Sequence, residues 1–193
     1  MARAAVLGRL TWQVAQVVDL RDETATARTL VLDVPSWPGH RAGQHVDVRL
    51  TAEDGYSTQR SYSIASAAGA DRIELTVQSV DAGEVSPYLA RDLAVGDVLE
   101  MRGPVGGWFV WEPGAHESVL LVAGGSGIVP LMSMVRTRAA AGDQTPFTLI
   151  YSVRTRVDAL FADDLDATRD VLVNYIYTRE APPGASVLPP VPG

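Results

Sequence analysis

The feature that most constrains this chain is a short apolar run that leads directly into a cluster of glycines. Val119–Ala123 has the length of a strand buried on both faces, and the glycine-rich turn Gly124–Gly127 follows it. From Ile128 onward apolar residues recur at helical spacing, and Pro130 suits the first turn of a helix, where no amide is needed. A strand, a glycine turn and a helix N-terminus together predict a phosphate cradle, because free amides point outward and no Cβ blocks the backbone.

Two simpler interpretations of this stretch compete with the cradle. A flexible Gly/Ser linker is disfavoured, because linkers are not preceded by an apolar strand and followed by an apolar helix. A strand–helix turn that binds nothing remains an alternative. The third glycine of the Gly-x-Gly-x-x-Gly fingerprint is replaced by Pro130, which argues against an ordinary dinucleotide-binding dehydrogenase.

Length, charge and cysteine content narrow the function classes. The chain has 193 residues, enough for one large domain or two small ones, and a net charge of −7, which disfavours nucleic acid or an acidic membrane as partner. It has no cysteine, so disulfides, thiolate nucleophiles and cysteine-ligated iron–sulfur clusters are excluded. Residues 1–10 lack the apolar core of a signal peptide, and no apolar run has the length of a membrane span. We expect a soluble cytoplasmic protein.

Short alternating runs separated by turn residues dominate the first part of the chain. The predicted strands are Trp12–Leu20, Thr29–Val34, His45–Leu50, Gln59–Ile64, Arg72–Val80 and Asp97–Met101. Strands of this length and spacing favour a six-stranded antiparallel β-barrel, interrupted by one short helix over Ser86–Leu93.

Strand and helix patterns alternate after Ser118, which indicates a parallel sheet. The predicted strands are Val119–Ala123, Phe147–Val153 and Val171–Tyr177, and the predicted helices are Ile128–Ala141 and Val157–Thr168. The sequence therefore predicts a barrel domain over residues 1–113 and an α/β nucleotide-binding domain over 114–180. A proline-rich tail over 181–193 is expected to be loose.

Two polar segments of the barrel could receive a ligand. In Arg60-Ser61-Tyr62-Ser63 the arginine can clamp a phosphate, and the tyrosine, two residues on, offers a ring on the same face of the strand. Polar edge strands often carry such residues without a ligand. The loop Gly83–Ser86 enters the short helix with Ser86 as the expected N-cap and Pro87 in its first turn. It is either a second phosphate site or an ordinary helix start.

Five motifs, in matching order and spacing, resemble the ferredoxin–NADP reductase family of flavoproteins. They are Arg60-Ser61-Tyr62-Ser63, Gly83-Glu84-Val85-Ser86, Gly103-Pro104-Val105-Gly106, Gly124-Gly125-Ser126-Gly127-Ile128-Val129-Pro130 and Tyr151-Ser152-Val153-Arg154. The resemblance covers about Trp12–Gly184 and implies an FAD-dependent oxidoreductase that passes reducing equivalents from NAD(P)H through flavin to an electron acceptor.

The resemblance also implies roles for individual residues. Tyr62 would lie against the flavin ring and Ser63 near its reactive edge, as the catalytic pair, with Arg60 on the pyrophosphate. The other residues expected to bind FAD or the dinucleotide are Ser61, Val77, Gly83, Glu84, Val85, Ser86, Gly124, Gly125, Ser126, Gly127, Ile128, Pro130, Ser152 and Arg154. FMN in place of FAD stays open, as does the nature of the acceptor, which is a redox protein in one interpretation.

The choice between NAD and NADP depends on the end of the second strand of the nucleotide domain. A carboxylate there usually meets a ribose hydroxyl, whereas this chain offers Ser152, Arg154 and Arg156, which suit a 2′-phosphate. We therefore favour NADP(H) over NAD(H). The alternative is that both arginines are solvated charges.

The chain departs from the family in two respects that bear on function. Further strands and a loop under the nicotinamide, which the family supplies, have no counterpart here, so Val119–Ala123 is expected to form an open apolar edge prone to pair with another chain. A flavin- or nucleotide-binding module with little hydride transfer is therefore the alternative function, and a structural barrel a third. The isolated His40, His45 and His116 show no metal-ligand spacing, so no metal site is expected.

Overall fold

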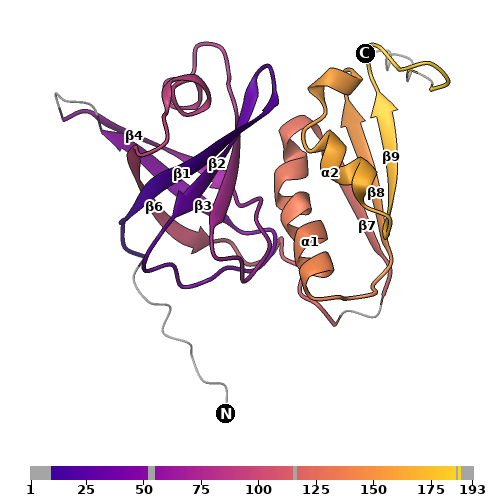
Figure 1. Ribbon diagram of the computed structural model, residues 1–193, viewed down its shortest axis with the longest axis horizontal. Coiled ribbons are helices and arrows are strands. Elements are labelled where there is room, and N and C mark those ends of the chain that lie inside the picture. Colours follow the sequence, from indigo (N-terminus) through magenta and orange to yellow (C-terminus); the bar gives the residue numbers. More distant parts are fainter. Residues whose placement is uncertain (1–9, 52–54, 115–116, 186, 188–193) are drawn as a thin grey trace.

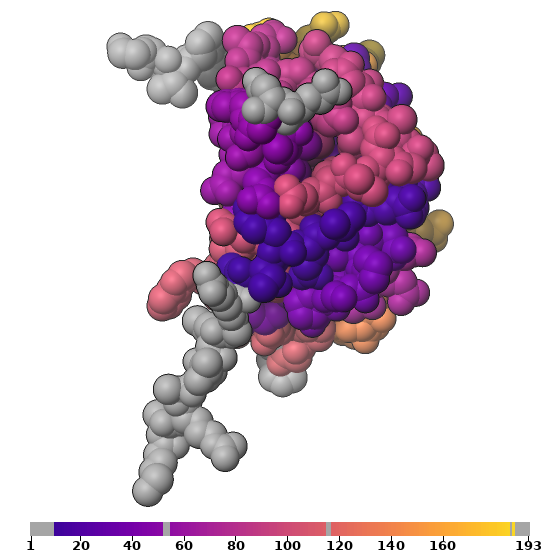
Figure 2. Space-filling model, turned by 90° about the vertical axis from the view of Figure 1, so that its left-hand side faces the viewer, coloured from indigo at the N-terminus to yellow at the C-terminus, as the bar shows by residue number. Residues whose placement is uncertain are grey.

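A computed structural model describes residues 10–51, 55–114, 117–185 and 187, and these form two parts that lie side by side (Figure 1). An antiparallel barrel comes first in the chain and a smaller parallel sheet second. Helix α1 (Ile128–Ala140) lies between them, which places the barrel on one side of the helix and the sheet on the other. The predicted two-part architecture is confirmed. Figure 2 shows the barrel side, which hides most of the parallel sheet.

Six strands form the barrel in the spatial order β4-β3-β6-β1-β2-β5, and all neighbours are antiparallel. Their bounds are β1 (Gln13–Thr24), β2 (Ala27–Asp33), β3 (His45–Thr51), β4 (Ser57–Ser63), β5 (Ile73–Gln78) and β6 (Val98–Val105). An isolated bridge between Ile64 and Leu75 joins the two ends of the sheet. This one bridge closes the barrel.

Alternation along the strands produces the barrel core. In β3 the side chains of Val46 and Val48 are fully buried, whereas those of Asp47 and Arg49 are partly exposed. The single π-helical turn η1 (Tyr88–Asp92), in the region predicted to be helical, adds Leu89 to the same apolar cluster. The barrel therefore has its own core, separate from that of the parallel sheet.

The hairpin between β1 and β2 is longer than the sequence predicts. The expected strand ends were Leu20 and Thr29, but β1 continues to Thr24 and β2 begins at Ala27. The hydroxyl of Thr24 accepts a hydrogen bond from the Thr26 amide at 3.3 Å. This local bond stabilises the turn without glycine, proline or asparagine, so the usual turn signal is missing from the sequence.

Three parallel strands form the second sheet in the order β7-β8-β9. They are β7 (Val119–Gly124), β8 (Phe147–Val153) and β9 (Val171–Tyr177). Their buried side chains pack with those of α1, whereas Leu120, Val122 and Leu172 are 61–64% exposed. Among the described residues β7 has no partner on its outer side, so the predicted open edge is confirmed.

The second predicted helix, Val157–Thr168, is confirmed only in its second half, where the α-helix α2 (Ala162–Ala167) forms. The first half is not α-helical: it contains the 3-10 turn η3 (Arg156–Asp158), and Phe161, directly before α2, has the left-handed conformation with φ 55°. The amide of Leu160 donates to the Tyr151 hydroxyl at 3.1 Å, and the amide of Phe161 donates to the Glu23 carboxylate at 3.2 Å. These tertiary bonds use amides that a continuous helix would need.

Two other expectations concern residues that the structure describes only in part or not at all. His116 and most of the proline-rich tail lie outside them, but Val187 forms a parallel bridge with Tyr177. None of the helices in the described part of the chain has the length and apolarity needed to cross a bilayer.

Candidate cofactor-binding site

Arg60 and Tyr62 share one face of the edge strand β4. They stand opposite Val48 and Val46, both fully buried, so their face continues the inner face of the barrel. The Tyr62 ring packs against the barrel core, whereas Arg60 stays exposed. Burial raises the pKa of Tyr62 to about 12, although the charge of Arg60 acts in the opposite direction. The phenol is therefore a neutral hydrogen-bond donor at physiological pH.

The guanidinium of Arg60 is available to a ligand. It donates hydrogen bonds to the Gln59 carbonyl at 2.7 Å and to the Thr58 hydroxyl at 3.3 Å, and no carboxylate of the described residues pairs with it. Ten other arginines in the same ranges form ion pairs with aspartate or glutamate, whereas the exposed Arg169 and Arg179, like Arg60, form none. In a chain of net charge −7, an exposed arginine without such a partner fits an anionic ligand.

Ser61 and Ser63 lie on the opposite face of β4. The Ser61 hydroxyl donates to Asp47 at 2.7 Å, and the same carboxylate accepts a hydrogen bond from Arg102 at 2.9 Å. Ser61 is therefore tied to the outer surface of the barrel. Ser63 stands opposite His45 at the last position of the strand and is partly buried.

An unpaired gap separates β4 from β5 beside Arg60. Continuing the register of the Ile64–Leu75 bridge would set Tyr62 opposite Val77 and Arg60 opposite Ser79, but β4 and β5 are the two unpaired ends of the sheet there. Val77 is fully buried and belongs to the barrel core. The Ser79 hydroxyl oxygen is buried without a hydrogen-bond partner among the described residues. No sequence motif marks Ser79, and its unpaired oxygen leaves one buried polar group of the barrel unsatisfied.

The loop Gly83–Ser86 folds back on itself. The Gly83 amide donates to the Val80 carbonyl at 2.9 Å, and the Ser86 hydroxyl accepts from the Val80 amide at 3.1 Å. The predicted N-cap role of Ser86 is therefore wrong: Pro87 occupies the cap position of η1, and no side chain caps it. Val85 is buried and anchors the loop in the barrel core.

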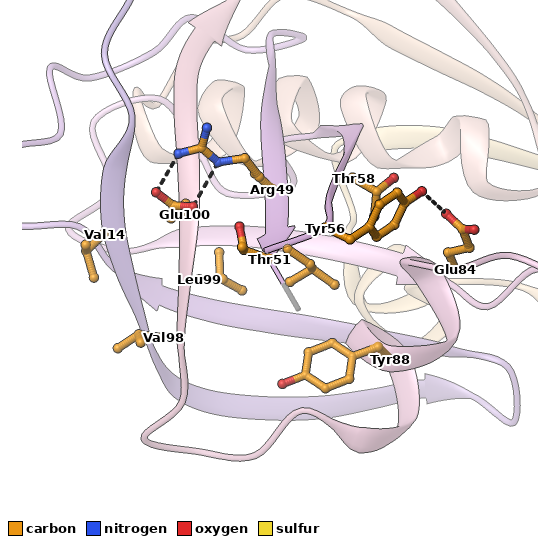
Figure 3. A pocket seen from close by; sticks show the side chains of 11 residues that line it. Val14, Arg49, Thr51, Tyr56, Thr58, Glu84, Tyr88, Val98, Leu99 and Glu100 are labelled. Atoms are coloured by element: carbon orange, nitrogen blue, oxygen red, sulfur yellow. Dashed lines mark hydrogen bonds and ion pairs between the residues drawn. The ribbon is translucent and has the colours of Figure 1, made fainter. Parts of the chain in front are cut away.

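A cavity of about 820 Å³ opens beside this loop (Figure 3). Two exposed tyrosines, Tyr56 and Tyr88, line it together with the Arg49–Glu100 ion pair. Of the predicted site residues only Glu84 takes part, and its carboxylate accepts a hydrogen bond from the Tyr56 hydroxyl at 3.3 Å. No sequence motif marks these two tyrosines, because Tyr56 is a single aromatic residue beside a turn and Tyr88 is the first residue of the short η1.

The glycine turn after β7 is open to solvent. Gly125–Gly127 form the 3-10 turn η2, all four residues of 124–127 are exposed, and Gly125 has a left-handed φ of 50°. A Cβ added at Gly124, Gly125 or Gly127 would meet no atom within 4 Å. The missing side chains therefore leave room for a ligand. Ile128 is fully buried and Pro130 lies in the first turn of α1, as predicted.

Ser152 and the arginines after it lie at the carboxyl end of β8. Ser152 is partly exposed. Arg154 forms an ion pair with Asp158 at 2.5 Å, and Arg156 pairs with Asp166. A hydrogen bond from Thr155, together with Arg154, keeps the pKa of Asp158 below its usual value despite partial desolvation. Both cations that the sequence offers to a 2′-phosphate therefore already have a carboxylate partner.

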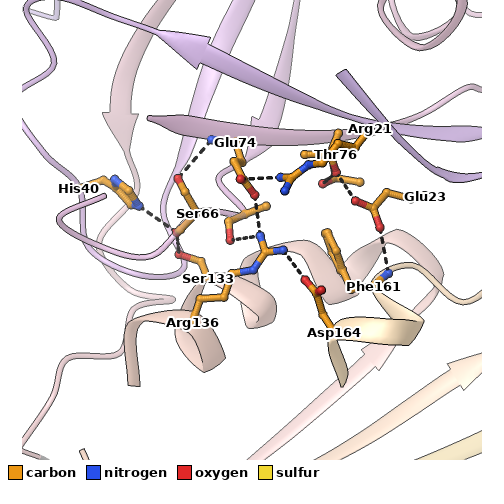
Figure 4. Close-up of polar contacts among 12 residues, drawn as sticks. Arg21, Glu23, His40, Ser66, Glu74, Thr76, Ser133, Arg136, Phe161 and Asp164 are labelled. Atoms are coloured by element: carbon orange, nitrogen blue, oxygen red, sulfur yellow. Dashed lines mark hydrogen bonds and ion pairs between the residues drawn. The ribbon is translucent and has the colours of Figure 1, made fainter. Parts of the chain in front are cut away.

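The barrel motif and the glycine turn flank one interface. Residues 65–68, directly after β4, receive hydrogen bonds from or donate them to the side chains of Ser133, Arg136 and Thr137 on α1 (Figure 4). Helix α1 begins at the glycine turn, and η2 also contacts β5. The two motifs are thus brought to the same side of the molecule by the packing of α1.

Two family models match the chain in sequence order. One, described as an oxidoreductase FAD-binding domain, matches residues 15–110, and the other, described as an oxidoreductase NAD-binding domain, matches residues 121–185. The first covers the barrel and the second covers the parallel sheet with its helices.

Individual proteins show the same similarity. Methane monooxygenase component C of Methylosinus trichosporium is 32% identical over 165 residues, which are 86% of this chain and 45% of that protein. NADH oxidoreductase HCR of Escherichia coli is 38% identical over 152 residues, or 77% and 46%. The chain thus spans about half the length of these curated relatives.

The solved structure of the Amycolatopsis cytochrome P450 reductase GcoB superimposes with a TM-score of 0.77 at 26% identity, covering 92% of this chain and 55% of that one. Both domain types occur in the same order in the sequence, and the fold agrees with that of a reductase. The chain therefore belongs to the ferredoxin–NADP reductase-like family of flavoprotein oxidoreductases.

Proposed function

We propose that this chain binds FAD at the β4–β5 gap and a nicotinamide dinucleotide at the glycine turn, and passes reducing equivalents from NAD(P)H through the flavin to an electron acceptor. The observation that carries the proposal is Arg60, an exposed arginine without a carboxylate partner in the described residues, on the same strand face as the half-buried ring of Tyr62. Both residues are on β4, an end strand of the barrel sheet that is not paired with β5 at this position. They provide donors for a pyrophosphate next to a half-buried tyrosine ring.

The residues of the site would bind and orient two ligands. FAD, when bound, supplies the hydride acceptance and the release of single electrons. Arg60 would hold the pyrophosphate, and Tyr62 would offer its ring to the flavin and its neutral hydroxyl as a donor. The open backbone at Gly125–Gly127 would hold the dinucleotide phosphates at the start of α1. The catalytic contribution of Tyr62 would therefore be placement of one ring against another, and Ser63, on the opposite face of β4, would reach the flavin only at the end of the strand.

Titration of the purified protein with FAD tests the first half of the proposal. Arg60→Ala should weaken FAD binding about tenfold or more, because a hydrogen bond to a charged group contributes about 1.5–3 kcal/mol. Arg72→Ala is a matched control, since this arginine is also exposed but pairs with Asp33 within the barrel. Equal FAD affinity of the Arg60 variant and the unchanged protein would rule out the assigned role.

Anaerobic addition of NADPH or NADH to the flavin-loaded protein tests the second half. Loss of the flavin absorbance would support a reductase. A second candidate function is a flavin- and nucleotide-binding module with little hydride transfer, which the open edge of β7 favours, because the sheet that carries the dinucleotide has only three strands in the described residues. Retained flavin colour despite measurable dinucleotide binding would support that module.

For the dinucleotide we propose NADP(H), on the basis of Ser152, Arg154 and Arg156. A 2′-phosphate would have to take Arg154 from Asp158, so Arg154→Ala should weaken NADPH binding and leave NADH binding nearly unchanged. Equal effects on both would favour NAD(H).

For the acceptor we propose a redox protein, and reduction of a haem or iron–sulfur protein by the loaded chain and NAD(P)H tests this.

A further inference from the structure

A single side chain, Arg136, connects three elements from two domains (Figure 4). Its guanidinium donates to the Glu74 carboxylate of β5 at 2.7 Å and to the Ala65 carbonyl at 3.1 Å. Its other terminal nitrogen donates to Asp164 of α2 at 2.6 Å. The arginine belongs to α1, so the first two bonds cross from the nucleotide domain to the barrel, whereas the third stays within the nucleotide domain.

The Arg136–Glu74 pair at the centre of the network is shielded from solvent, whereas Arg21 and Asp164 are 46% and 53% exposed. The side chains of Arg136 and Glu74 are 21% and 19% exposed, and the Phe161 ring lies 5.1 Å from the guanidinium carbon. Arg21 of the barrel donates to the other oxygen of Glu74 at 2.5 Å. Charges that are largely removed from water hold their geometry more strictly than surface ion pairs do.

Two neighbours on α1 add bonds across the same boundary. The Ser133 hydroxyl is fully buried and donates to the Ser66 carbonyl at 2.7 Å, and the Thr137 hydroxyl accepts from the Ala68 amide at 2.8 Å. Ser133, Arg136 and Thr137 are spaced three and four residues apart, so they form one stripe of the helix. The stripe is polar although it is buried, which fixes the position of the helix along the barrel more specifically than apolar contacts alone.

The two ends of this network lie next to the two proposed cofactor segments. Ala65 follows β4, with its Arg60 and Tyr62, by two residues. Arg136 is on the helix that begins directly after the glycine turn. A rotation of α1 about the barrel would therefore move the glycine turn relative to Tyr62, and the bonds of Arg136 resist that rotation.

We infer that Arg136 is a positioning residue that sets the distance and tilt between the dinucleotide-binding turn and the flavin-binding strand. The inference rests on the proposed function, because it assigns to the interface the alignment of the two rings. Misplacement of reacting groups by about 1 Å reduces rates roughly 100-fold. Loss of the hydrogen bonds at the domain boundary should therefore slow the hydride transfer between the two rings.

Distance measurements between two spin labels test this without activity. The chain has no cysteine, so Val98→Cys in β6 and Leu172→Cys in β9 provide two exposed labelling sites, one in each domain. In the otherwise unchanged chain we expect one narrow distance distribution. Arg136→Met should broaden or shift it, and Arg136→Lys should have a smaller effect.

Variants of the partner residues keep the test decisive if Arg136→Met does not fold. Glu74→Gln removes the ion pair of Arg136 that crosses the boundary and should broaden the distribution, whereas Asp164→Asn removes its ion pair inside the nucleotide domain and should leave the distribution narrow. Arg21→Met controls for the ion pair that Glu74 makes within the barrel. An unchanged distribution in every folded variant among Arg136→Met and Glu74→Gln would overturn the inference.

A kinetic measurement separates this inference from the proposed function. In flavin-loaded Arg136→Met we expect flavin content and dinucleotide affinity to be retained, while the rate of flavin reduction at saturating NAD(P)H falls roughly 10- to 100-fold. If the unchanged chain does not reduce its flavin, the proposed hydride transfer fails, and the distance measurement alone decides the positioning role. An undiminished rate in Arg136→Met would contradict that role.

Discussion

The barrel and the parallel sheet contain similar apolar residues, but the barrel buries leucines that the parallel sheet leaves exposed on one face. The barrel closes on itself through the Ile64–Leu75 bridge, and leucines of its core, such as Leu75, are fully buried. The parallel sheet is covered by helices on one face, and Leu172 on its other face is 63% exposed. Apolar composition alone therefore does not tell how much a residue stabilises the fold, because closure of the sheet decides which side chains leave water.

The largest expected effect contrasts a leucine from each sheet. Leu75→Ala should lower the free energy of unfolding by roughly 2–5 kcal/mol, because it leaves a cavity in the barrel core. Leu172→Ala should change it by less than about 0.5 kcal/mol, since that side chain already contacts water. Urea denaturation followed by circular dichroism measures both. Similar losses would show that the exposed face of the parallel sheet is covered in solution.

The second prediction concerns two glycines with the same backbone conformation. Gly125 in the nucleotide turn and Gly142 after α1 have φ values of 50° and 62°, and a Cβ at either would meet no atom within 4 Å. Replacement by alanine should cost about 1–2 kcal/mol of stability at each position. Only Gly125→Ala should also weaken dinucleotide binding, about tenfold, measured by titration calorimetry. Equal affinity in both variants would move the dinucleotide away from this turn.

The third prediction compares two valines that are each 64% exposed. Val122 is on the open edge strand β7, whereas Val98 is on β6, which has a partner strand on both sides. We expect the unchanged protein to self-associate at high concentration and Val122→Lys to suppress this, because a charge on an open edge prevents strand pairing. Light scattering after size-exclusion chromatography should show no such effect for Val98→Lys. A monomeric unchanged protein at high concentration would contradict the open-edge hypothesis.

The smallest expected effect is a pH dependence at the domain boundary. Burial lowers the pKa of His40 below 6.5, although its hydrogen bond with the Ser66 carbonyl (3.2 Å) opposes the shift. The unfolded state then binds more protons than the folded state, so stability should fall as the pH decreases from about 6.5 toward the folded pKa. Thermal unfolding between pH 7.5 and 5.5 measures this, and His40→Gln should reduce the dependence. An identical slope in the variant would assign it to other groups.

Local patterns predicted most of the secondary structure correctly. The alternation of polar and apolar residues in His45–Leu50 and the apolar run Val119–Ala123 both identified strands. Each pattern follows from which faces of the strand are buried in its sheet. The break at Phe161 could not be predicted, since it depends on hydrogen bonds that the Leu160 and Phe161 amides donate to side chains of other strands, those of Tyr151 in β8 and Glu23 in β1. The same holds for the longer β1–β2 hairpin.

The sequence indicated the site motifs but not their surroundings. Arg60 and Tyr62 were predicted on one face of a strand, and the register agrees. That Arg60 lacks a carboxylate partner, while Arg154 and Arg156 have one, follows only from the folded arrangement of the described residues. Ser79 and Arg136 could not be identified from the sequence for the same reason. The Ser79 hydroxyl stands out only because it has no partner in the described part of the fold, and Arg136 only because its hydrogen bonds cross the domain boundary.

The long β1–β2 hairpin has a consequence for engineering by recombination. Near its tip, Glu23 accepts a hydrogen bond from the Phe161 amide, so this hairpin of the barrel is bound to the segment after β8. A chimera that joins the second half of a relative to this barrel would lose the hydrogen bond between Glu23 and Phe161, unless the hairpin residues 21–28 are taken from the same relative. The natural crossover unit is thus not the contiguous second half of the chain, but that half plus one small loop from the first.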